Sequence, residues 1–263
     1  MKIIAPLLVV LISCFLILTV FFVNTSSKKV YTIDVSQKLE SAKKNDNDYG
    51  QTIGWLTIYE TGIDLPVLNI PESEEEADMK VDFTDFAWNV GETEEFQNHM
   101  VIQGHNLRNL SSNPEIDLKY FERFDNLPAF LYIDYAKEHQ YIQYTMNGKT
   151  HVYKIFSVFI TDTAGYKFVS REASLKENKK YIKKYLKDTM YDYDVDVNEN
   201  DNILVLLTCT RFYGEDNLER TVTVVGRELR EKEKAKDYKV TANNKYKRVL
   251  KQMKNEGDEI NEA

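Results

Sequence analysis

The sequence predicts a mainly β domain, a closed or nearly closed β-barrel with added helices, behind an N-terminal apolar segment. Between Gly54 and Leu229 the chain is a series of short apolar stretches separated by turn-forming residues, which is typical of strands. The dipeptide Asn147-Gly148 separates two of these stretches and is a strong signal for a β-hairpin. Leu175–Thr189 instead has apolar residues at helical spacing, so one amphipathic helix is expected among the strands.

The composition excludes several functional classes. Hydrophobic residues make up 43% of the 263 residues and aromatic residues 12%, which is enough for a packed core and argues against disorder. The net charge is −8, whereas a nucleic-acid-binding protein needs a basic footprint, so we expect no nucleic-acid partner. There are two cysteines and no disulfide framework. The four histidines are scattered without zinc spacing, so we expect no metal and no cofactor.

Residues 1–27 are predicted to be a transmembrane anchor. Ile3–Val23 is apolar except for one proline, one serine and one threonine. As a helix it would span about 30 Å, the thickness of the hydrocarbon core of a bilayer. A cleaved signal peptide, the alternative, would have a shorter apolar region and a small-residue cleavage site. We expect a single-pass protein of the cell membrane with its domain outside the cell, although Lys2 and Lys28-Lys29 weakly favour the reverse orientation.

Three further regions are expected after the anchor. Residues 28–50 are polar with Val35, Leu39 and Ala42 at helical spacing, which indicates a stalk and an N-terminal helix. The barrel should occupy residues 51–230, and residues 231–263 form a charged C-terminal extension. The acidic run Glu72–Asp78 is read as a solvated loop, because it lacks the spaced oxygen ligands and the glycine of a calcium loop.

The individual strands follow from short runs of apolar and β-branched residues. The predicted strands are Gly54–Ile58, Leu65–Asn69, Met100–Gly104, Phe130–Asp134, Gln140–Met146, Thr150–Thr161, Ile203–Cys209 and Thr221–Leu229.

Cys209 is the residue whose chemistry could define the function, because the other cysteine lies within the apolar segment. A lone cysteine at the end of an apolar run is most often an inert small hydrophobe. A nucleophilic cysteine needs a partner that generates the thiolate, and acyl transfer also needs donors near the oxyanion. His105 and Arg220 each stand at an end of a predicted strand, and neighbouring strand ends of a barrel can meet at one rim.

Each of these two residues suits a separate task. His105 could exchange protons with the thiol and with the leaving amine. Arg220 could stabilise the oxyanion through a permanent charge and fixed donors. Arg211 is a rival because it is nearer in sequence to Cys209. We favour Arg220, since it opens the strand that would lie beside Cys209 if the last two strands pair as a hairpin.

At these residues the chain resembles the sortases, the membrane-anchored cysteine transpeptidases of Gram-positive bacteria. Val205-Leu206-Leu207-Thr208-Cys209 is similar to the family motif TLxTC except that Val205 replaces a threonine. Gln103-Gly104-His105-Asn106 is similar to the histidine motif, Arg220 to the arginine of the last strand, and 54–67 to the first two strands. The resemblance implies a closed sortase-type barrel. In it Cys209 is the nucleophile, His105 the general acid and base, and Arg220 stabilises the oxyanion or substrate, with Thr208 and Leu207 in substrate binding.

The N-terminal helical region and the long helix before the cysteine strand resemble class B sortases, which do not require calcium. The resemblance implies that Cys209 attacks the threonine carbonyl of a sorting signal of the LPxTG or NPxTN type. A thioacyl-enzyme forms, and an amine of a lipid II cross-bridge or a pilin lysine resolves it. The implied partners are a surface protein or pilin that carries the signal, and that amine. Two residues depart from the family: Val205, which is expected to alter the floor of the substrate groove, and Arg211, where some class B members carry an acidic residue.

Two alternatives stay open at this point. The first is a catalytically inactive anchored β-domain that binds a surface partner, which the presence of all three catalytic residue types disfavours. The second is a cysteine hydrolase that transfers the acyl group to water. It would use the same residues, so only a product assay with and without an added amine separates it from a transpeptidase.

Overall fold

A computed structural model describes residues 31–44, 50–70, 86–91, 95–106, 123–162, 166, 168–210, 220–249 and 251. The predicted anchor, Glu72–Asp78 and Arg211 lie outside these residues, and no described helix is long and apolar enough to cross a membrane. The helices and strands are α2 (Ser36–Lys44), β1 (Gln51–Thr57), β2 (Asp64–Asn69), β3 (Ala87–Asn89), β4 (His99–Gly104), η1 (Arg123–Leu131), α5 (Ile133–Glu138), β5 (Tyr141–Met146), β6 (Lys149–Asp162), α6 (Leu175–Asp188), β7 (Tyr191–Tyr193), β8 (Ile203–Cys209), β9 (Arg220–Glu228) and β10 (Val240–Ala242).

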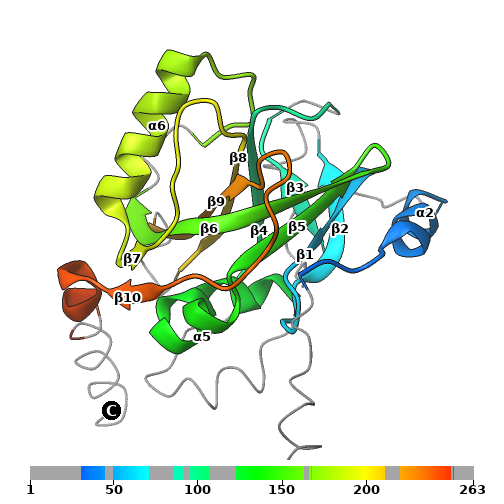
Figure 1. Ribbon diagram of the computed structural model, residues 1–263. Coiled ribbons are helices and arrows are strands. Elements are labelled where there is room, and N and C mark those ends of the chain that lie inside the picture. Colours follow the sequence, from blue (N-terminus) through cyan, green and yellow to red (C-terminus); the bar gives the residue numbers. More distant parts are fainter. Residues whose placement is uncertain are drawn as a thin grey trace, which may run out of the picture. The chain divides into compact units, whose positions relative to one another are not determined.

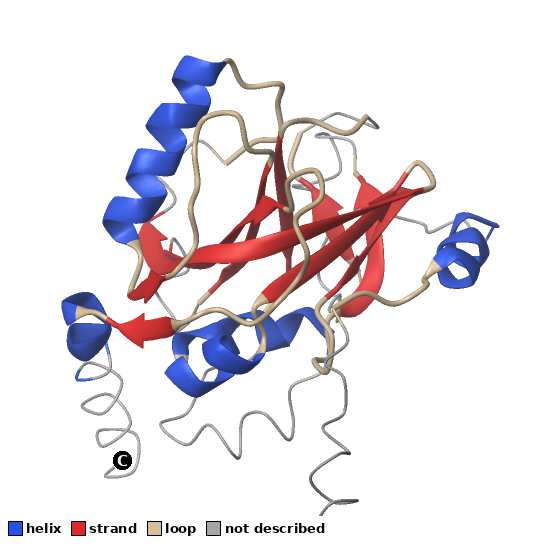
Figure 2. Ribbon diagram, viewed as in Figure 1, coloured by secondary structure: helices blue, strands red, loops and turns tan. Residues whose placement is uncertain are grey.

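Eight of the described strands close into a barrel in the order β1-β2-β3-β4-β8-β9-β6-β5 (Figure 1). Neighbouring strands of the barrel are antiparallel, except that β2 pairs parallel with β3 and β4 pairs parallel with β8. The predicted hairpin joins β5 to β6. Asn147 and Gly148 both have positive φ there, 52° and 71°, as a type I′ turn requires. The prediction of a mainly β closed barrel is confirmed, and Figure 2 shows the helices outside the strands.

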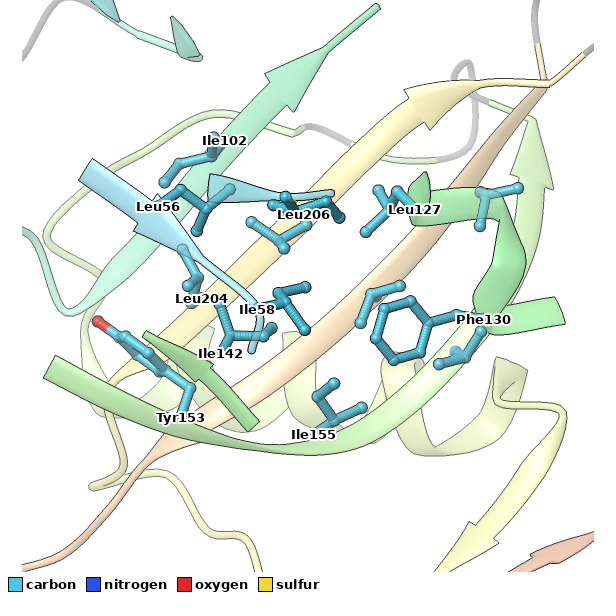
Figure 3. Close-up of a cluster of buried hydrophobic side chains, with 14 of the residues drawn as sticks. Leu56, Ile58, Ile102, Leu127, Phe130, Ile142, Tyr153, Ile155, Leu204 and Leu206 are labelled. Carbon is cyan, nitrogen blue, oxygen red and sulfur yellow. The ribbon is translucent and has the colours of Figure 1, made fainter. Parts of the chain in front are cut away.

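The strand β8 is apolar from Ile203 to Leu207, and these residues are buried on both faces of the strand. Leu204 and Leu206 belong to the large cluster that fills the barrel, which Figure 3 shows in close-up. Val205 and Leu207 alternate with them and belong to a second cluster that includes residues of α6. Successive residues of β8 are therefore buried in two separate cores. One fills the barrel, and the other lies on its outer face and includes residues of α6.

The helix α6 lies along one side of the barrel, and α2 lies on the opposite side (Figure 1). A capping box starts α6: the Ser174 hydroxyl accepts from the N–H of Glu177, whose carboxylate accepts from the N–H of Ser174. Its buried face carries Asn178, Ile182 and Tyr185. Both α6 and α2 occur where the sequence predicts a helix.

The segment Phe130–Asp134 was predicted as a strand, and this prediction is wrong. It contains the end of η1 and the start of α5, and the N–H of Tyr132 donates to the carbonyl of Ala129 at 2.9 Å. Phe130 and Leu131 are completely buried, and Phe130 points into the cluster within the barrel (Figure 3). A short apolar run that is buried on all sides has no periodicity that separates a strand from a helical turn.

The charged C-terminal extension is packed against the barrel over residues 231–249. Its strand β10 pairs antiparallel with β7. The hydroxyl of Tyr238 donates to the carbonyls of Gln140 and Ile155, at 2.6 and 2.7 Å. Tyr246 is 9% exposed, within a helical turn at 244–249. Tyr238 and Tyr246 thus attach the highly charged C-terminal extension to the rest of the domain.

Candidate active site

The parallel pairing of β4 with β8 brings the predicted histidine and cysteine to the same end of the barrel. The ladder runs from His99 opposite Ile203 to Gln103 opposite Leu207, so His105 follows β4 where Cys209 ends β8. Two side-chain hydrogen bonds extend this contact. Thr208 Oγ1 donates to the carbonyl of Gly104 at 2.7 Å, and Asn106 Nδ2 donates to the carbonyl of Cys209 at 3.0 Å.

Arg220 opens β9, which pairs antiparallel with β8 as predicted. Cys209 lies opposite Thr221, and the N–H of Thr210 donates to the carbonyl of Arg220 at 2.9 Å. His105, Cys209 and Arg220 are each partly exposed. The three predicted catalytic residues therefore lie at one rim of the barrel, at the ends of three strands that are neighbours in the sheet. His105 comes from a part of the chain far from Cys209 and Arg220.

The imidazole of His105 packs against the indole of Trp88 in β3. Their ring centroids are 4.8 Å apart and the ring planes are inclined by 48°. Trp88 is 4% exposed, so it forms a fixed wall beside the histidine. Partial burial lowers the pKa of His105, because the charged imidazolium loses hydration. At neutral pH the ring is therefore mainly neutral, the form that can accept a proton from a thiol.

The model of the Sortase domain matches residues 56–228, well over half of the chain and all of the strands that form this rim. The chain belongs to the sortase family. The sortase B of Listeria monocytogenes is 26% identical over 202 residues, which cover 70% of this chain and 75% of that protein.

Two solved structures share the fold of this sortase. A mutant form of Clostridium perfringens sortase B superposes with a TM-score of 0.56 at 20% identity, covering 74% of this chain and 88% of that one. A Staphylococcus aureus sortase B–substrate complex gives a TM-score of 0.54 at 19% identity, covering 74% and 85%. The predicted resemblance to class B sortases, a group of transpeptidases, is confirmed by these relatives.

The two residues predicted to bind substrate in this sortase lie beneath the rim. Thr208 is fully buried, with its hydroxyl bound to Gly104, and Leu207 is 2% exposed within the cluster that includes α6. Val205, the residue that departs from the family motif, is fully buried in the same cluster. A direct contact of Thr208 or Leu207 with the substrate stays a prediction.

Sequence reasoning missed two residues of the sortase site, Trp88 and Asn106. Trp88 lies in the three-residue strand β3, which is too short for a periodic signal. Asn106 stands in the histidine motif, but nothing in the sequence indicates that its side chain reaches β8. Among the described residues, no three His, Cys, Asp or Glu side chains come together as a metal site.

Proposed function

We propose that this sortase cleaves a C-terminal sorting signal of the LPxTG or NPxTN type at its threonine and transfers the protein to an amine of the cell wall or of a pilin. The observation that carries the proposal is the convergence of Cys209, His105 and Arg220 at one rim of a barrel that matches the sortase family. The S. aureus relative was solved as a complex with a substrate, which supports a substrate site in this fold.

In the first half-reaction the Sγ of Cys209 attacks the threonine carbonyl carbon, and the thiol proton passes to His105. The carbonyl π electrons move to oxygen, and the guanidinium of Arg220 stabilises the resulting oxyanion. When the intermediate collapses, the carbon–nitrogen bond of the scissile peptide breaks. His105 returns the proton to the leaving amine, and the substrate is left as a thioester on Cys209.

In the second half-reaction an acceptor amine attacks the thioester carbonyl. His105 takes the proton that the amine loses and delivers it to the departing thiolate of Cys209. A new amide bond links the substrate to its acceptor, and the enzyme returns to its starting state. His105 must release its proton readily in both halves, and the burial that lowers its pKa favours this release.

We propose further that residues 1–27 anchor the enzyme in the cell membrane as a single span, with the catalytic domain outside the cell where sorting signals and wall amines are present. The support for this location is the length and apolar character of Ile3–Val23. Protease digestion of intact cells tests it, since an external domain is degraded and an internal one is protected.

The chemistry is tested with the full-length chain in detergent micelles, incubated with a panel of LPxTG-like and NPxTN-like peptides. Intact mass should show an acyl adduct on Cys209 that hydroxylamine releases and that is absent from Cys209→Ala. His105→Ala and Arg220→Ala should each reduce the rate of adduct formation by about 100-fold or more. Added triglycine or a lysine peptide should divert the product from the free acid to the amide, whereas a hydrolase would ignore it.

The same experiment separates the remaining alternative. If no peptide gives an adduct while a thiol reagent labels Cys209, the recognition motif lies outside the panel. If Cys209 also resists labelling in the folded chain, the cysteine is inert and the protein is a binding domain.

A further inference from the structure

One peptide group next to the nucleophile is held from both sides. The carbonyl of Cys209 accepts a hydrogen bond from Asn106 Nδ2 at 3.0 Å. The N–H of Thr210, which belongs to the same planar peptide group, donates to the carbonyl of Arg220 at 2.9 Å. This single peptide therefore connects the residue after His105 with the backbone of Arg220. Its orientation is fixed relative to both strands that flank β8.

Asn106 joins the end of β4 to the end of β8 beyond the last paired residues of their ladder. The ladder between β4 and β8 pairs residues up to Gln103 and Leu207. Beyond that point Thr208 Oγ1 and Asn106 Nδ2 each donate to a main-chain carbonyl of the other strand. Asn106 is 8% exposed and Thr208 is 0% exposed, so water does not readily replace these bonds. The end of β4 is thereby attached to the end of β8 on both sides of Cys209.

We infer that Asn106 is a positioning residue, which sets the separation of His105 from Cys209 through its hydrogen bond to the Cys209 carbonyl. The inference rests on the proposed roles of His105 and Cys209. Proton transfer between them needs heavy atoms within about 2.6–3.2 Å, and a misplacement of about 1 Å can cost about 100-fold in rate. Asn106 is adjacent to the histidine and bonded to the cysteine, so losing the bond changes the geometry of that pair directly.

Three substitutions of the full-length chain separate the donor from the shape of the side chain. Asn106→Leu has similar size but no donor, and Asn106→Asp has the same shape but places an acceptor against a carbonyl. Asn106→Gln keeps the amide donor on a longer side chain and should recover part of the loss. The matched control is Asn178→Leu: Asn178 is 1% exposed, and its Nδ2 donates to the carbonyls of Glu199 and Asp201, at 3.0 and 2.9 Å.

The readouts are the single-turnover rate of peptide acylation, the KM for the peptide, the melting temperature, and the pH profile of Cys209 alkylation by iodoacetamide. We expect Asn106→Leu and Asn106→Asp to lower the acylation rate by about 10- to 100-fold, with KM changed by less than about 2-fold. The alkylation profile should change in both variants. Asn178→Leu should lower the melting temperature and leave both the acylation rate and the profile unchanged.

The inference is overturned if Asn106→Leu acylates at the parental rate. It is also overturned if the rate falls only in proportion to the loss of folded protein, as it would in the control. If Asn106→Leu does not fold, the ratio of rates between Asn106→Gln and Asn106→Asp decides, and equal rates reject the inference. If no peptide of the panel acylates the parental chain, the proposed LPxTG or NPxTN specificity fails; the alkylation profile still tests Asn106, and an unchanged profile rejects its role.

Discussion

The guanidinium of Arg227 donates to both carboxylate oxygens of Glu233, at 2.5 and 2.9 Å, and the arginine side chain is only 3% exposed. Lys154, 8% exposed, donates to the same carboxylate at 3.2 Å. Glu233 belongs to the C-terminal extension, whereas Arg227 and Lys154 lie in paired barrel strands. The extension thus provides the counter-charge for two buried cations of the barrel.

Removing this carboxylate should destabilise the fold. Glu233→Ala leaves the buried guanidinium of Arg227 without its partner, which costs about 3–5 kcal/mol in a fully buried pair. Because Glu233 is 24% exposed, we expect a loss of about 2–3 kcal/mol in the free energy of unfolding, measured with urea at pH 7. The control is Glu231→Ala, since the Glu231 side chain is 90% exposed and should contribute less than about 0.5 kcal/mol. Equal losses in the two variants would contradict the prediction.

The same carboxylate should make stability depend on pH below about 4.5. Hydrogen bonds from Arg227 hold the pKa of Glu233 at about 2, against burial, which acts to raise it. Since the folded pKa lies below the unfolded value of 4.5, the stabilisation is complete above pH 4.5 and is lost as the pH falls towards 2. The difference in unfolding free energy between the parent and Glu233→Gln should therefore shrink from pH 5 to pH 2.5. A difference that stays constant over this range would exclude Glu233 as the source.

His99 should give a second dependence at higher pH. It is 1% exposed, and its Nε2 lies 3.0 Å from the hydroxyl of Tyr185. Burial, and next the nearby Arg171, lower its pKa from 6.5 to about 4. The unfolded chain is protonated first, so stability falls as the pH drops from 6.5 to 4, by on the order of 3 kcal/mol. Urea unfolding at pH 7.0, 5.5 and 4.5 should show a steeper slope in the parent than in His99→Gln, in which the lowered pKa of His105 still contributes.

Gly104 should tolerate no side chain. A Cβ at this position would overlap the ring of Phe124, which is completely buried in the barrel core. Gly104→Ala should cost about 1–3 kcal/mol in unfolding free energy. It should also slow peptide acylation, because Gly104 precedes His105 and its carbonyl accepts from Thr208. The double variant Gly104→Ala/Phe124→Leu should recover part of both losses, and purely additive effects would show that the two positions are not coupled.

Local signals were sufficient for much of this fold. Asn147-Gly148 predicted its hairpin because few dipeptides adopt two positive φ angles, and 203–209 and 220–228 form the predicted strands. The position of Arg220 beside Cys209 could also be predicted, since a hairpin of β8 with β9 brings the two residues together. These predictions depend on contacts between neighbours in sequence or on a pair of consecutive strands.

The features that could not be predicted from the sequence depend on contacts between residues that are distant in the chain. The ring of Trp88 reaches His105 only because the three residues of β3 pair with β4. Phe130 lies in η1, and its side chain is buried among residues of strands from elsewhere in the chain, so its apolar character does not distinguish a helix from a strand. The tyrosines of the extension stand among charged residues, and their partners are distant in the chain: Tyr238 donates to the carbonyls of Gln140 and Ile155, and the ring of Tyr246 contacts that of Tyr191. In each case tertiary packing determines the position of the side chain, and no local sequence pattern predicts it.

The parallel contact of β4 with β8 also sets the order in which the site can form during folding. The residues that it joins are 103 and 104 positions apart in the chain, so one of the longest loops must close before the rim exists. A chain that has formed its hairpins but has not closed the barrel holds the thiol and the imidazole far apart. Reactivity towards a peptide should therefore return last in a refolding experiment, after the native hairpins, and serve as a sign that folding is complete.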